Sequence, residues 1–149
     1  MSVVLVAALT QFVAMSDTMG LRNQSYADAG SQVAIQANLI RARILLCGSD
    51  YPDGNNGTPY RPALPGGSVA LFVSTLVCPG TAQNLWTGTD GVTYPPTPKF
   101  MTRNWQYVND ATSARLMIVG DGNALAQAAT RLGTDATVSG SILTFKVSN

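Results

Sequence analysis

The fold is decided by the first 47 residues, which open with MSVVLVAALTQFVAMS at positions 1–16. This opening has no charged side chain, and no proline interrupts the chain before Cys47. The pattern predicts a helix whose apolar surface is stabilised by contact with other apolar surfaces, because burying apolar area is worth about 25 cal/mol per Å². The residues expected to form this assembly surface are Val3, Val4, Leu5, Val6, Leu9, Phe12, Val13 and Met15.

The helical pattern continues beyond Asp17 and becomes amphipathic. Five apolar residues recur at intervals of 4, 3, 4 and 3, which places them on one helix face. They are Val33, Ala37, Ile40, Ile44 and Cys47. We therefore predict a protruding hydrophobic helix over residues 1–30 and a globular head over residues 31–149, which includes the amphipathic half of the helix.

Two glycines weaken the helix between its apolar and amphipathic halves, at about 1 kcal/mol each relative to alanine. They are Gly20 and Gly30, so we expect a bend or local melting within residues 17–30. A helical hairpin inside an ordinary globule is the alternative interpretation of the same residues.

The rest of the chain predicts a loop-rich head. Gly48 is expected to end the helix. Residues 48–68 contain four prolines and many Gly and Asn residues, so we expect them to form a loop without regular secondary structure. Strand-like composition, or alternation of apolar and polar residues, predicts strands over 69–77, 105–108, 114–119 and 142–147. A strand end and a turn are expected at 138–140.

A second, shorter helix is expected over residues 124–132. Asp121 can cap its first turn, and Gly133 can end it. The predicted fold class is therefore α+β, with a long N-terminal helix packed on a small antiparallel sheet.

The two cysteines, Cys47 and Cys78, bracket a loop-rich segment. In an oxidising compartment we expect them to form one disulfide, which would stabilise the fold by about 3–4 kcal/mol. Two buried free thiols are the alternative. A zinc site is not expected, because two Cys and no His cannot supply the usual ligand set.

Charged residues are scarce, at 11% of the chain, and the net charge is only +1. Nucleic-acid binding needs clustered Lys and Arg, and here these residues are scattered singly, so no nucleic-acid partner is expected. The chain has no His and no Glu, which excludes a Ser-His-Asp triad and leaves Cys47 without an activating imidazole. We expect no catalytic residue and no cofactor.

The remaining candidate ligands are oxygen atoms in Gly-rich turns. Residues 50–56 hold two Asp and two Asn, but calcium takes about six to eight oxygens, usually with several carboxylates. We interpret this loop, and the turns at Asp90 and Asp121, as turn and cap chemistry, so no metal site is expected.

Four stretches carry a family resemblance. They are LIRARILLC at 39–47, YPDGNNGT at 51–58, LVCPG at 76–80 and LWTGTDG at 85–91. A hydrophobic N-terminal helix that runs into a cysteine and a Tyr-Pro loop, followed by a small antiparallel sheet, resembles type IV pilins and pilin-like proteins. The chain departs from that family at position 5, where pilins carry Glu and this chain has Leu5.

The resemblance implies a structural subunit of an extracellular helical filament at the cell surface, with helices bundled inside and heads outside. Its partners would be copies of itself, and the inner membrane would hold it before assembly. The apolar run ends at Asp17 and is short for a bilayer span, which takes about 20 apolar residues.

Two other classes of function fit the same composition. A viral capsid or filament coat protein also buries an apolar N-terminal arm. A secreted adhesin-type binding module would use its aromatic side chains, with Trp86 or Trp105 against a glycan. We interpret Trp86, Tyr94, Trp105 and Tyr107 instead as core and subunit-contact residues.

Overall fold

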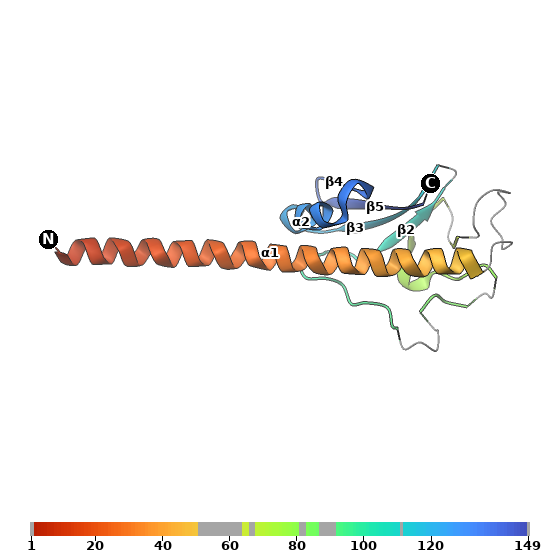
Figure 1. Cartoon of the computed structure of the whole chain (residues 1–149), viewed down its shortest axis with the longest axis horizontal. Coiled ribbons are helices and arrows are strands. Elements are labelled where there is room, and N and C mark those ends of the chain that lie inside the picture. Colours follow the sequence, from red (N-terminus) through yellow and green to blue (C-terminus); the bar gives the residue numbers. More distant parts are fainter. Residues whose placement is uncertain are drawn as a thin grey trace.

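A computed structural model describes residues 2–50, 64–65, 68–80, 83–86, 92–110 and 112–148, with the side chains of the first helix described from Gly20 onward. The chain order is a long helix, a small antiparallel sheet and a short helix inserted between two strands of that sheet. The second half of the long helix lies beside the sheet and the short helix, and its first half projects alone (Figure 1). The predicted α+β class is confirmed.

The long helix, α1 (Ser2–Asp50), runs without interruption for 49 residues. At 1.5 Å per residue its length is about 74 Å. The bend or melting expected within residues 17–30 is therefore wrong, and so is the helical hairpin. The physical reason at Gly30 is packing, because this glycine is buried against the short helix and lets the two backbones approach closely.

The C-terminal end of α1 also differs from prediction. The helix does not stop at Gly48 but continues to Asp50. A glycine inside a helix costs only about 1 kcal/mol, and the buried Cys47 beside it is tied to the head by a disulfide. Tertiary contacts of this turn therefore outweigh the local preference of Gly48.

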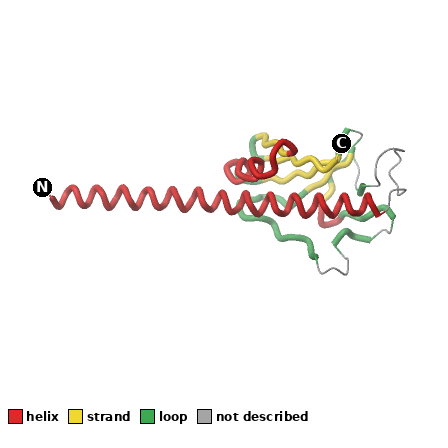
Figure 2. Tube along the Cα trace, in the orientation of Figure 1, coloured by secondary structure: helices red, strands yellow, loops and turns green. Residues whose placement is uncertain are grey.

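The sheet has five antiparallel strands in the order β1-β2-β3-β5-β4. The strands are β1 (Leu71–Phe72), β2 (Gln106–Asn109), β3 (Ala114–Val119), β4 (Ala136–Ser139) and β5 (Ile142–Ser148). Figure 2 shows these strands and the short helix gathered beside one half of α1. The predicted strands at 105–108, 114–119 and 142–147 are confirmed to within one residue at either end.

The strand predicted over 69–77 is wrong for most of its length. Only Leu71–Phe72 forms β1, and the 3-10 helix η1 (Val73–Thr75) follows it. Val73 and Leu76 are both buried, at 0% and 1% exposure. Residues three apart point to opposite faces of a strand but to the same side of a 3-10 turn, so the turn lets both side chains enter the core.

The short helix, α2 (Gly122–Leu132), has the cap that the sequence predicts. The Asp121 carboxylate accepts hydrogen bonds from the backbone N–H groups of Asn123 and Ala124. The helix ends at Gly133, whose φ of 74° lies in the region that favours glycine. The 3-10 helix η2 (Gly133–Asp135) then leads into β4.

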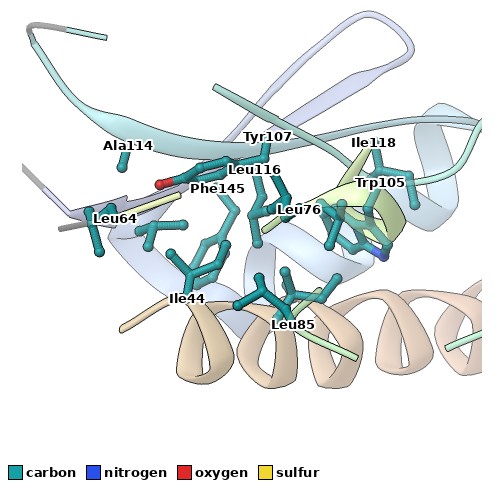
Figure 3. Packing of buried hydrophobic residues seen from close by; sticks show 14 of the residues in the cluster. Ile44, Leu64, Leu76, Leu85, Trp105, Tyr107, Ala114, Leu116, Ile118 and Phe145 are labelled. Atoms are coloured by element: carbon teal, nitrogen blue, oxygen red, sulfur yellow. The ribbon is translucent and has the colours of Figure 1, made fainter. Parts of the chain in front are cut away.

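The core lies between the second half of α1, the inner face of the sheet and the loop segments. All five residues of the amphipathic stripe are buried, from 0% to 5% exposed. Figure 3 shows Ile44 of α1 near Phe145 and Leu116 of the sheet, with Leu76 and Leu85 from the loops beside them. The largest fully buried side chains are Trp105, Tyr107, Phe145, Ile40, Ile44, Leu76, Leu116, Ile118, Leu125, Leu143, Val33 and Val73.

Candidate assembly interface

The projecting part of α1 begins where the helix leaves the head. Arg22 and Tyr26 line a cavity of about 380 Å³ together with Asn123 and Gln127 of α2, whereas Leu21 is 67% exposed. Ser2 to Leu21 is 20 residues, so about 30 Å of helix extends beyond the head. The end of the region predicted to protrude, residues 26–30, contacts the head.

The eight predicted assembly residues all lie in this projecting part of α1. Its backbone is helical from Ser2 onward, as the apolar run predicts. The side chains of residues 1–19 lie outside the described part of the structure, so their packing against other copies stays a prediction. Among the fully described residues, no helix is long and apolar enough to cross a membrane.

An aromatic contact fixes the helix where it leaves the head. The rings of Tyr26 and Phe100 lie 5.2 Å apart, and the Lys99 ammonium sits 5.2 Å from the centre of the Phe100 ring. Phe100 has a φ of 67°, which is strained for a residue with a side chain. Its backbone oxygen accepts from the Asp121 N–H at 3.0 Å, so the loop is held beside α2.

This contact was not predicted from the sequence. Tyr26 lies 74 residues from Phe100; it falls on the continuation of the core stripe, at intervals of 4 and 3 through Gly30 to Val33, whereas no pattern marks Phe100. The nearest sequence signal is Gly120, because a side chain there would collide with the Met101 sulfur and the Phe100 oxygen. A glycine before the cap residue Asp121 thus lets the loop approach the end of β3.

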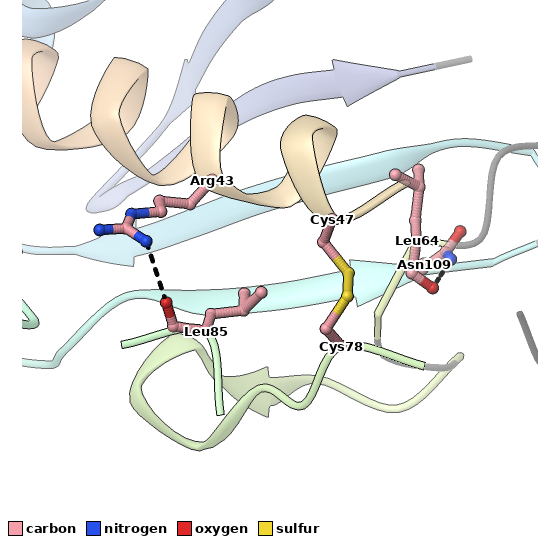
Figure 4. The surroundings of a disulfide bond; sticks show 6 residues. All are labelled: Arg43, Cys47, Leu64, Cys78, Leu85 and Asn109. Carbon is pink, nitrogen blue, oxygen red and sulfur yellow. Dashed lines mark hydrogen bonds between the residues drawn. A yellow bond between two sulfur atoms is a disulfide. The ribbon is translucent and has the colours of Figure 1, made fainter. Parts of the chain in front are cut away.

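The opposite end of α1 is fastened by the predicted disulfide between Cys47 and Cys78, whose Cα atoms are 5.8 Å apart (Figure 4). The alternative of two free thiols is therefore excluded. Arg43 reinforces this end, because its Nη1 donates to the Leu85 oxygen at 3.4 Å and its guanidinium lies 5.8 Å from the Trp86 ring centre. The last turns of α1 are thus held on the head by covalent and polar contacts.

The predicted aromatic residues are core residues. Trp105 is 1% exposed and donates through Nε1 to the Gln36 side-chain oxygen at 3.0 Å. Trp86 is 9% exposed and donates to the Val73 oxygen at 3.0 Å. Because both rings are buried, neither offers a face to a glycan. Burial also raises the pKa of the Tyr94 hydroxyl, whose ring packs edge-on against Trp86.

The candidate oxygen ligands divide into two groups. Asp53, Asn55, Asn56 and Asp90 lie outside the described residues. Asp50 is the exposed last residue of α1, and Asp121 is used as a helix cap, as predicted. Within the described segments, no group of three or more Asp or Cys residues is arranged to hold a metal ion.

The outer face of α1 within the head carries an unpredicted feature. Four residues recur there at intervals of 4, 3 and 4, and we call them the outer stripe: Ile35, Leu39, Ala42 and Leu46. Each follows a core residue of α1 by two positions, which is a rotation of about 200° around the helix. Ile35 is 65% exposed and Leu46 is 54% exposed, so this half of α1 is apolar on two opposite faces.

No family model, curated protein or solved structure matches this chain. The geometry of the chain itself therefore carries the functional argument.

Proposed function

We propose that the protein is a structural subunit that assembles with copies of itself into an extracellular filament through the projecting part of α1. The observation that carries this proposal is the continuous helix Ser2–Asp50, whose first 20 residues extend beyond the head. Residues 1–16 of this extension have no charge. An uncharged, apolar helical segment that does not contact its own head is suited to burial among other chains.

Helix physics supports a bound partner for this segment. Most helix stability in proteins comes from packing an apolar face rather than from helix propensity. The extension has no part of its own head to pack on. Large exposed apolar patches mark interaction sites. Packing of residues 3–15 against other copies would supply the missing contacts.

The head is built to stay folded while the extension binds. Its core is closed by the second half of α1, the sheet and α2, and the Cys47–Cys78 disulfide fastens the end of the helix. In a filament, the extensions would bundle at the centre and the heads would cover the outside, as the resemblance to pilin-like proteins implies.

The test is to place a charge in the extension. We expect Val6→Asp to abolish filaments, because a carboxylate buried among apolar helices without a partner is strongly unfavourable. Electron microscopy of purified protein at matched concentration provides the measurement. The wild type should form thin filaments with a helical repeat.

Ser139→Asp provides the control. Ser139 is exposed on β4, so the substitution adds the same charge to the surface of the head and outside α1. This variant should assemble like the wild type. Filaments of Val6→Asp that match those of the wild type would refute the packing of residues 3–15, and closed shells would favour a capsid protein.

A further inference from the structure

The outer stripe is free of charge because the two neighbouring arginines turn toward the head. Arg41 and Arg43 are the only charged residues between Asp28 and Asp50. Arg41 pairs with Asp135 at 3.1 Å and lies 5.3 Å from the centre of the Phe145 ring. Arg43 is held by its contacts with Leu85 and Trp86. The solvent-facing side of the helix between Gln32 and Leu46 is therefore left without a charged side chain, and its exposed polar residues there are Gln32 and Asn38.

We propose that the outer stripe is the docking surface for residues 3–15 of a second copy of this chain. The inference rests on the proposed self-assembly and names the surface on which the extension lies. It differs from bundling of the extensions with one another, because here the extension of one copy packs on the head half of another copy's α1.

The two surfaces match in length and chemistry. Residues 3–15 span about 18 Å of helix and the outer stripe, residues 35–46, spans about 17 Å. Residues 3–15 and the four residues of the stripe are all uncharged, so contact between them buries no ion. The intervals of 4 and 3 residues in the stripe are those by which one helix packs along another.

The size of the stripe argues against a pair of copies joined stripe to stripe. A contact about 17 Å long and about 10 Å wide covers on the order of 200 Å² per partner, whereas a stable interface covers about 800 Å² per partner, so one contact on the stripe is too small to hold two copies together by itself. Docking of the extension on the stripe gives each copy two such contacts, one as donor and one as acceptor, and bundling of the extensions in the proposed filament adds to them. Such head-to-tail contacts between different surfaces build open polymers when the rotation between copies does not close a ring.

Cysteine cross-linking tests the contact directly. Leu9 is the middle of the extension's apolar run and Ala42 is near the middle of the stripe, so the two should meet whether the helices run parallel or antiparallel. Copies carrying only Leu9→Cys are mixed with tagged copies carrying only Ala42→Cys, allowed to assemble and then oxidised. The native Cys47 and Cys78 are already paired.

We expect disulfide-linked heterodimers of Leu9→Cys and Ala42→Cys copies. Ser139→Cys in place of Ala42→Cys is the control, since Ser139 is exposed on β4 and should give none. Cross-links only between two Leu9→Cys copies would overturn the inference and leave the bundled filament intact. Heterodimers from closed particles without filaments would support the inference and contradict the proposed function.

A second variant tests the stripe without new cysteines. Leu46→Asp places a charge on an exposed position, so the head should fold and keep its disulfide. The assembled fraction should fall more than about tenfold, as an unpaired buried charge requires. Assembly equal to that of Ser139→Asp would overturn the inference.

Discussion

At the scale of single residues, Gly30 sets how closely α1 and α2 pack. A Cβ at this position would lie 2.5 Å from the Gln127 Cβ and 2.9 Å from the Ala124 oxygen. Because a backbone atom cannot move aside alone, Gly30→Ala must separate the helices. We expect a loss of about 1–3 kcal/mol in the free energy of unfolding, measured by denaturant titration.

Gly20 offers the matched control for this prediction. A Cβ there meets nothing within 4 Å, so Gly20→Ala should stabilise the helix by up to about 1 kcal/mol. The same glycine-to-alanine substitution at two positions of one helix should thus change the free energy of unfolding in opposite directions. Equal effects would show that α1 and α2 are not in close contact at Gly30.

Asp110 gives a prediction about pH. Hydrogen bonds from the Thr112 side chain and from Arg115 lower the pKa of the Asp110 carboxyl well below its ordinary value. Folding therefore favours the carboxylate, and this stabilisation is complete above the unfolded pKa of about 3.9 and is lost as the pH falls below it. Asp110→Asn should be less stable than the wild type at pH 7, and the difference should shrink by about pH 2. A difference that is the same at both pH values, measured by denaturant titration, would contradict this role.

At the scale of elements, the disulfide fastens the end of α1 to the segment that follows β1 and η1. Cys47 and Cys78 are 31 residues apart in sequence, so the bridge restricts a long loop of the unfolded chain. The entropy of loop closure predicts that Cys47→Ala combined with Cys78→Ala loses about 3–4 kcal/mol of stability.

Denaturant titration with and without reductant checks this value. The reduced wild type should match the double variant, since both lack the bridge. A double variant as stable as the oxidised wild type would show that the contacts of Arg43 with Leu85 and Trp86 hold this end of the helix by themselves.

At the scale of the whole molecule, folding and assembly use different parts of one helix. Val6 lies 16 residues, or about 24 Å, before Arg22, where contact with the head begins. Val6→Asp should therefore remove assembly while the thermal unfolding midpoint of the dissociated head stays within about 2 °C of the wild type. A large fall in this midpoint would mean that the extension packs on its own head.

The sequence by itself determined the elements that depend on local pattern. The core stripe of α1, the alternation in β3 and β5, and the cap of α2 by Asp121 were all predicted, because each signal lies within a few neighbouring residues. The same holds for the α+β class and for the pairing of the only two cysteines. The uncharged run at residues 1–16 was also evident, since it is a matter of composition.

Tertiary structure decided what local pattern leaves open. The low helix propensity of glycine predicts a bend in α1 at Gly30. The helix is nevertheless continuous there, because Gly30 packs closely on α2. Val73 and Leu76 form a turn because both must enter the core. The stripe from Ile35 to Leu46 has the same spacing as the core stripe, and only the position of the sheet determines which face is buried. The exposed face exists because the head covers one side of α1 alone.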